Sequence, residues 1–168
     1  MRVFQPVDPE DVESGAYIFS ARKFLVTAGD GTRVNTTAVS NGGVGQMWGK
    51  RVVFICVREN RYTKELIEAS GEFSLSFLDN NEYRGAIKYL EAVSGRDEDK
   101  LKGARLNICY HESVPFIEES SNVIICKVLY RKAIGTDGFV DETIRDEFYK
   151  GDNRHIIYVG EIIKVLVR

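Results

Sequence analysis

Along the first half of the chain, hydrophobic and polar positions follow the patterns of strands joined by turns. Residues 17–28 are rich in β-branched and aromatic types, residues 29–31 are typical of a hairpin turn, and residues 33–40 return as a second strand. Residues 41–50 hold four glycines and predict a loop. The continuous apolar run of residues 51–58 then predicts a strand buried on both faces.

The middle of the chain changes from the strand period to the helix period. Residues 62–71 predict a short helix, with Thr63 as its N-cap and Gly71 just past its C-terminus. Strict alternation over residues 72–77 predicts a half-buried strand. Apolar side chains at helical spacing over residues 83–90 predict a second helix.

The last third returns to strands. A polar stretch, residues 94–100, leads into a short third helix, and residues 122–132 and 155–167 are long runs rich in valine and isoleucine. Residues 140–149 fit either a short helix or an ordered loop. The pattern predicts one mainly β domain over residues 1–168, with antiparallel strands and short helices in the connections. Closing the sheet into a barrel would protect its edge strands.

Composition narrows the functional classes. The 168 residues are 43% hydrophobic and 29% charged, as in ordinary globular proteins. A formal net charge of −2 gives no support for nucleic-acid binding. No apolar run approaches the roughly 20 residues that cross a membrane, and the acidic N-terminus lacks an apolar signal core. We therefore expect a cytoplasmic protein with no membrane or nucleic-acid partner.

The cysteines and histidines do not form a metal or disulfide pattern. Cys56, Cys109 and Cys126 are odd in number and lack CxxC spacing. Cys56 and Cys126 lie in apolar runs, where free cysteines are usually buried. His111 and His155 have no second histidine or helix-spaced carboxylate nearby, so we expect no metal site.

The glycine-rich segment invites comparison with dinucleotide-binding loops. Gly43 and Gly45 begin that spacing, but Trp48 occupies the place of the third glycine. The predicted element that follows is a strand rather than a helix, so the segment is not a Rossmann fingerprint. It is either a flexible connection or a loop that lets the backbone approach a flat ring.

Two polar segments are candidates for phosphate binding. Arg58, Arg61 and Thr63 flank the start of the first predicted helix, where free N–H groups and the dipole attract anions. Arginine adds a bidentate fork for phosphate. A capped surface helix with solvated arginines fits the spacing equally well. The second segment, residues 94–100, is either another phosphate contact or a solvated charged loop.

The remaining candidate is His155, just before the last strand. It is either a structural histidine or a hydrogen-bond donor or proton relay near a redox ring. No serine, cysteine and histidine form a hydrolase motif. If the chain is an enzyme, a cofactor therefore carries the chemistry.

Seven short segments lie in an order and spacing that match a known family over roughly residues 15–168. The segments are residues 34–40, 42–45 with Trp48, Arg58, 61–63 with Glu65 and Ile67, 72–77, 94–97 with Asp99 and Lys100, and 155–162. Together they resemble the flavin reductase-like family of FMN-binding split-barrel proteins, which includes the flavoredoxins. The resemblance implies an antiparallel split β-barrel and a homodimer with FMN at or near the subunit interface.

The resemblance also implies roles for individual residues. One strand would run along the edge of the isoalloxazine ring, Trp48 would pack near the ring, and His155 would lie where the nicotinamide or acceptor docks. The strand residues are Asn35, Thr36, Thr37, Ala38, Val39 and Ser40. The FMN phosphate would be held by Arg58, Arg61, Tyr62 and Thr63, with the loop of Ser94, Gly95, Arg96 and Lys100 approaching from the other side.

By resemblance, the activity is an NAD(P)H-dependent flavin reductase that passes a hydride from NADH or NADPH to flavin and electrons onward. The alternative is a flavoredoxin-type carrier that exchanges electrons with a redox protein partner and does not use NAD(P)H. A barrel that has lost its flavin is disfavoured by the intact segments 61–63 and 94–96. Asn41, Leu90 and Glu91 depart from relatives that carry an aromatic residue and a Cys-Gly pair there.

Overall fold

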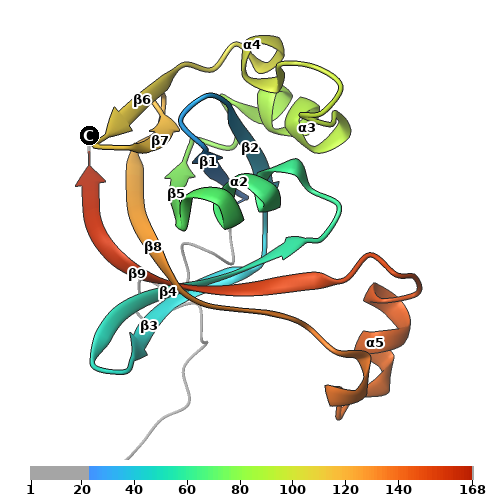
Figure 1. Cartoon of the computed structure of the whole chain (residues 1–168). Helices are drawn as coiled ribbons and strands as arrows, with labels where there is room; N and C mark the ends of the chain where they lie inside the picture. The colour runs from blue at the N-terminus through green and yellow to red at the C-terminus, as the bar shows by residue number, and fades with distance from the viewer. Residues whose placement is uncertain (1–22, 168) are drawn as a thin grey trace, which may run out of the picture.

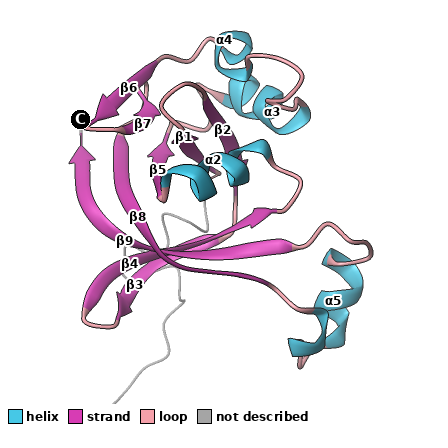
Figure 2. Ribbon diagram, viewed as in Figure 1, coloured by secondary structure: helices cyan, strands magenta, loops and turns pink. Residues whose placement is uncertain are grey.

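The computed structural model describes residues 23–167, and its main feature is one antiparallel sheet of seven strands that curls around a core (Figure 1). The strands lie in the order β2-β1-β5-β8-β9-β4-β3, and a separate hairpin, β6–β7, packs on β1 and β5. Short helices occupy the connections (Figure 2). The elements are β1 (Phe24–Gly29), β2 (Val34–Val39), β3 (Gly42–Met47), β4 (Lys50–Arg58), α2 (Tyr62–Ser70), β5 (Glu72–Phe77), α3 (Arg84–Ala92), α4 (Lys100–Ala104), β6 (Ile108–His111), β7 (Val114–Ile117), β8 (Asn122–Ala133), η3 (Thr136–Gly138), α5 (Glu142–Phe148) and β9 (His155–Val167).

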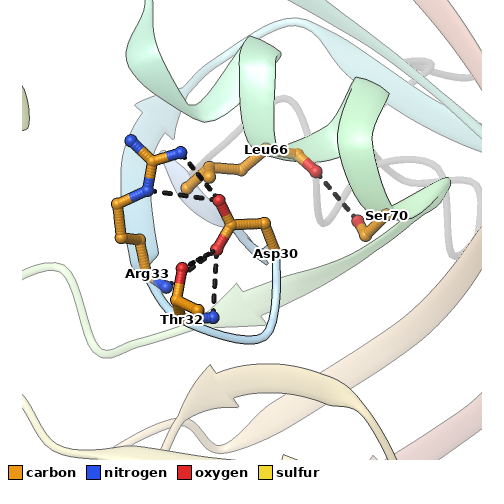
Figure 3. Close-up of polar contacts among 5 residues, drawn as sticks. All are labelled: Asp30, Thr32, Arg33, Leu66 and Ser70. Atoms are coloured by element: carbon orange, nitrogen blue, oxygen red, sulfur yellow. Dashed lines mark hydrogen bonds and ion pairs between the residues drawn. The ribbon is translucent and has the colours of Figure 1, made fainter.

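The predicted first hairpin is present, and its turn is fixed by one carboxylate. Asp30 accepts hydrogen bonds from the backbone N–H and hydroxyl of Thr32, at 3.0 and 2.8 Å, and from the backbone and guanidinium of Arg33 (Figure 3). These bonds hold the pKa of Asp30 well below its usual range. In the same view, Ser70 at the end of α2 donates its hydroxyl to the carbonyl of Leu66. The predicted strand residues 17–22 lie outside the described part.

The prediction of a loop over residues 41–50 is wrong. Residues 42–47 form β3, which pairs with β4, and Trp48 and Gly49 make the tight turn with φ of 54° and 70°. Two positive φ angles suit a two-residue hairpin turn. Gly43 is needed for packing, because a Cβ there would lie 2.6 Å from Cζ of Phe54. The segment is therefore an edge strand, in which Gly43 makes room for the ring of Phe54.

The prediction of a half-buried β5 is also wrong, because β5 is covered on both faces. Phe73, Leu75 and Phe77 point into the core as predicted, but Ser74 and Ser76 are fully buried too. Ser74 donates to the carbonyl of Pro115 at 2.7 Å, and Ser76 accepts from the N–H of Ile117 at 3.1 Å. The unpredicted β6–β7 hairpin supplies both partners, so hydrogen bonds satisfy the serines that the pattern placed in solvent.

The opposite error occurs in β4, which is not buried on both faces. Val53, Ile55 and Val57 are buried, whereas Phe54 on the other face is 43% exposed. Phe54 instead packs over Gly43 of the neighbouring edge strand.

The chain passes directly from β2 at one edge of the sheet to β3 at the other edge. The backbone N–H of Cys56 in β4 donates to the carbonyl of Asn41 at 3.1 Å, which joins the β2–β3 connection to β4. Both Cys56 and Cys126 were expected to be buried; Cys126 is buried, whereas Cys56 is half-buried. The curled sheet surrounds one main core cluster, which includes Phe24, Val26, Val53, Ile55, Val57, Leu66, Ile67, Phe73, Leu75, Cys126 and Tyr158.

Strands β8 and β9 extend beyond the barrel and carry a protruding arm, residues 134–154, which contains η3 and α5 (Figure 1). The sequence left either a short helix or an ordered loop open for residues 140–149, and the structure has the helix α5 there. Asp141 caps it by accepting from the N–H of Thr143 at 2.9 Å. The arm returns to the barrel at His155, where β9 begins beside Arg58 of β4.

Candidate functional site

Two adjoining pockets lie at the N-terminal end of α2. We call them the cation pocket and the strand pocket, and both are lined by Thr37 and Arg61. The cation pocket is also lined by Asn35, Asn60, Tyr62, Thr63, Ala92, Val93, Ser94, Gly95 and Lys100. The strand pocket is also lined by Ala38, Val39, Ser40, Asn41, Cys56, Val57, Arg58 and His155. Most of the residues expected at the site are therefore brought together.

The start of α2 differs from the prediction, because Thr63 is not its N-cap. Arg61 takes the N-cap position with an extended backbone, and no side chain caps the helix. Thr63 is the second helical residue and is fully buried. Its hydroxyl accepts a hydrogen bond from Nδ2 of Asn35 at 2.9 Å, which leaves the hydroxyl hydrogen for another acceptor. The uncapped N–H groups of the first turn and the helix dipole favour an anion here.

Lys100 is the most informative residue of the cation pocket. The residue as a whole is 3% exposed, and its ammonium, which reaches the pocket, pairs with no carboxylate or other acceptor among residues 23–167. Burial and the nearby charge of Arg61 lower the pKa of Lys100 to about 8. Asp99 fixes this placement, because it caps α4 by accepting from the N–H groups of Leu101 and Lys102. A partly desolvated ammonium without a partner favours the binding of an anion beside it.

Arg61 is the second cation of this pocket. It is half-buried, and its Nη1 donates to the carbonyl of Glu91 at 3.3 Å, which leaves the rest of the guanidinium for a ligand. Ser94 lies in the same wall, where its hydroxyl accepts from the N–H of Arg96 at 3.2 Å. Arg61, Lys100 and the hydroxyl groups of Thr63 and Ser94 thus make a donor set suited to a phosphate dianion.

The resemblance implied that Arg96 approaches the FMN phosphate, but in the structure its side chain lies outside the cation pocket. Its guanidinium pairs with Glu65 and donates to the carbonyl of Asn60 at 2.8 Å. Its Cζ also lies 5.4 Å from the ring centroid of Tyr62, as Arg33 does at 5.5 Å. Arg96 lines a neighbouring groove rather than the cation pocket. It braces the 94–97 loop against the start of α2.

A close approach between β2 and the 94–97 loop depends on Gly95. A Cβ at this position would lie 2.1 Å from Oδ1 of Asn35. Asn35 is 4% exposed and bonded to Thr63, so its amide has no free room to move. The glycine therefore lets the loop reach the strand and complete the wall of the cation pocket.

The end of strand β2 lines the two pockets, whereas Thr36 does not. Thr37 lines both pockets, and Ala38 through Ser40 line the strand pocket. Thr36 faces the other way, since its hydroxyl donates to the carbonyl of Val26 at 3.1 Å and accepts from Thr27. The side chain of Thr36 therefore has no access to either pocket.

Arg58 lines the strand pocket and not the cation pocket. Its Nη1 donates to the carbonyl of Asn153 at 2.6 Å, and its Nη2 donates to the carbonyl of Phe148 at 3.0 Å. Its Cζ lies 5.3 Å from the ring centroid of Tyr149. Arg58 thus holds the arm against the barrel rather than standing free for a phosphate.

His155 lies in the strand pocket beside that arm. Its Nδ1 is 2.8 Å from the hydroxyl of Tyr149. Burial, with the charge of Arg58 adding to it, lowers the pKa of His155, so the ring is neutral near pH 7. Tyr149 was missed at the level of sequence, because nothing in residues 140–149 marks it as a partner of the histidine.

The remaining expected residues lie elsewhere. Trp48 is 62% exposed in the β3–β4 turn, packs against Tyr130 and lines neither pocket of this chain. Leu90 is fully buried in the cluster under α3 and α4. Glu91 contributes its carbonyl to Arg61, while Asn41 lines the strand pocket. Only the Asn41 departure therefore changes the wall of a pocket directly.

Over residues 23–167, no group of three His, Cys, Asp or Glu side chains is placed to hold a metal ion. No helix in that part of the chain is both long and apolar enough to cross a membrane.

Several solved structures share the fold of this chain. The chain is similar in structure to flavoredoxin from Methanosarcina acetivorans, with TM-score 0.67, 20% identity, and 96% of this chain and 76% of that chain covered. It is also similar to an FMN-binding protein from Thermus thermophilus, with TM-score 0.69, 19% identity and coverage of 100% and 82%. A third similar structure is the NADH:FAD oxidoreductase of Streptomyces globisporus C-1027, with TM-score 0.64, 17% identity and coverage of 99% and 89%.

At these identities the structures establish the fold, which is the antiparallel split barrel that the sequence predicted. No curated protein matches the chain. The model of the flavin reductase like domain matches residues 17–168, so the chain belongs to the flavin reductase-like family.

Proposed function

We propose that this protein binds FMN and works as a flavin-dependent oxidoreductase, with the FMN phosphate in the cation pocket. The observation that carries the proposal is Lys100, a residue 3% exposed whose ammonium reaches the pocket beside Arg61 and pairs with no acceptor in the described chain. A phosphate dianion would neutralise both cations, and the uncapped start of α2 would add backbone donors. Thr63 and Ser94 would donate their hydroxyl groups to the same phosphate.

The ring of FMN would lie in the strand pocket, which adjoins the cation pocket through Thr37 and Arg61. When bound, FMN supplies a ring that accepts a hydride and passes electrons on. The backbone of residues 37–40 would orient the ring edge by hydrogen bonds. Arg58 would keep the arm beside the ring, and His155 would offer a polar group at the end of the pocket.

In the first candidate function the protein is a reductase that takes electrons from NADH or NADPH. In the second it is an electron carrier that receives them from a redox protein. The similar proteins include both an NADH:FAD oxidoreductase and a flavoredoxin, so family likeness supports each. An anaerobic spectrum of the FMN-loaded protein separates them. Bleaching of the flavin band by NADPH or NADH supports the reductase, whereas a band that persists until dithionite is added supports the carrier.

The proposed active form is a homodimer, as the family resemblance implied. Four large apolar side chains on or beside the β3–β4 hairpin are 43–62% exposed in the single chain: Met47 and Trp48 at its turn, Tyr130 against Trp48, and Phe54 further along β4. Exposed apolar groups that gather in one region are typical of an interface. Light scattering on the FMN-loaded protein would give twice the chain mass, and the single-chain mass would refute the dimer.

Lys100 should give FMN binding a distinct pH dependence. In the free protein the pKa of Lys100 is lowered to about 8, while a bound dianion favours the ammonium and raises this pKa. Binding above that pH therefore takes up a proton, and affinity should fall by up to about tenfold per pH unit between about pH 8 and 10. Below about pH 6 the FMN phosphate loses its second charge, which also weakens binding.

Fluorescence titrations of FMN at fixed ionic strength from pH 6 to 10 measure this profile. The Lys100→Met variant serves as the control, since it should lose the slope above pH 8. A wild-type affinity that stays constant up to pH 10 would refute the role of Lys100.

A further inference from the structure

The contact between the arm and His155 has a consequence for the chemistry of the strand pocket. The hydroxyl of Tyr149 lies 2.8 Å from Nδ1 of His155, and the two rings meet edge to face with centroids 5.5 Å apart. Tyr149 is held in turn by Arg58 over its ring and by Phe139, whose ring centroid lies 5.1 Å away. Both partners of the hydrogen bond are therefore fixed by packing.

The direction of this hydrogen bond follows from the two groups. A neutral imidazole has one N–H donor and one acceptor nitrogen, and a phenol can either donate or accept. Phenol is the more acidic donor and the imidazole nitrogen the more basic acceptor, so O–H···N is the stronger arrangement. Burial raises the pKa of Tyr149, which keeps its hydroxyl protonated.

We infer that Tyr149 is a positioning residue that donates to Nδ1 of His155 and so fixes the tautomer with hydrogen on Nε2. Nδ1 is then occupied by the arm, and Nε2 is the one ring nitrogen left to act in the strand pocket. No group within residues 23–167 accepts from Nε2. The pocket thus holds a neutral N–H donor, which under the proposed function would face an oxygen or nitrogen of the flavin or its substrate.

The charged and titratable groups around His155 are consistent with a neutral ring. Arg58 on β4 adds a positive charge, and Arg61 lines the same pocket from the start of α2. Cys56 on β4 is a thiol whose pKa is raised by burial, so it is uncharged. None of these groups competes with Tyr149 as a donor to Nδ1.

The tautomer is measurable because the chain has only two histidines, His111 and His155. Nitrogen-15 NMR of the FMN-free protein should show a pyridine-type shift at Nδ1 and a pyrrole-type shift at Nε2 for His155 near pH 8. In Tyr149→Phe this preference should weaken, and the pKa of His155 should rise by roughly half to one pH unit, since a bond that stabilises the neutral ring is lost. His111 is the internal reference and should not change.

Tyr130→Phe is the matched control, because it removes an exposed hydroxyl that bonds to no described residue. A wild-type His155 with hydrogen on Nδ1 would overturn the inference without any variant. An unchanged tautomer and pKa in Tyr149→Phe would also overturn it. Since the measurement needs no flavin, a failure of FMN binding would leave this result intact. A wrong tautomer would likewise leave the proposal of FMN binding untouched.

Discussion

Replacing Lys100 with methionine should weaken FMN binding by roughly 10- to 100-fold, which corresponds to the loss of one charge-assisted contact with the phosphate. The same change should leave the FMN-free protein at least as stable as the wild type. The reason is that Lys100 is 3% exposed as a residue and its ammonium has no partner in the described chain, so the hydration that the ammonium loses on folding is not compensated. Methionine fills a similar volume with no charge.

Affinity is measured by quenching of FMN fluorescence, and stability by urea unfolding of the FMN-free protein. Lys102→Met is the matched control, because Lys102 lies two positions further along α4 and is exposed. It should change neither quantity appreciably. A Lys100→Met protein that binds FMN normally, or that unfolds much more easily without FMN, would contradict the assignment of Lys100.

Replacing Gly95 with alanine should reduce FMN affinity at least tenfold and cost about 1–3 kcal/mol of the free energy of unfolding, as overpacking usually does. The new Cβ would lie 2.1 Å from Oδ1 of Asn35. Either the 94–97 loop moves away from β2 or the Asn35 amide turns and loses its bond to Thr63. Both responses displace groups that line the cation pocket.

Gly85→Ala is the control for this experiment. Gly85 lies in α3 with nothing within 4 Å of an added Cβ, so alanine there should stabilise the helix slightly and leave FMN binding unchanged. Equal behaviour of the two variants would show that the contact between Gly95 and Asn35 does not matter for the site. Fluorescence titration measures the FMN affinity of each variant, and urea unfolding measures its free energy of unfolding.

The sequence predicted the strands and helices that have a clear period, and it failed where tertiary contacts override the local pattern. Ser74 and Ser76 alternate with apolar residues as on a solvated face, but the β6–β7 hairpin buries and bonds them. The glycines of residues 42–45 look like a loop, yet the ring of Phe54 covers Gly43 and the segment pairs as an edge strand. No local periodicity encodes either partner.

The candidate site shows the same limits. The start of α2 was predicted as an anion site with Thr63 as the N-cap, but the N-cap is Arg61, and the hydroxyl of Thr63 accepts a hydrogen bond from Asn35. Lys100 lies in a stretch that looks solvated, and only the cap on α4 and the packing of that helix turn it inward. Tyr149 reaches His155 through the arm, a contact that the order of residues alone does not reveal.

The phosphate of FMN should be held by Lys100 and the half-buried Arg61, and a comparison of FMN with riboflavin tests this assignment most directly. The two share the ring, and riboflavin lacks the phosphate. Fluorescence titrations of the wild-type protein at pH 7.5 should give an affinity for FMN at least about 100-fold higher than for riboflavin, as expected when two charge-assisted contacts are lost. Equal affinities, or no binding of either flavin, would contradict the account.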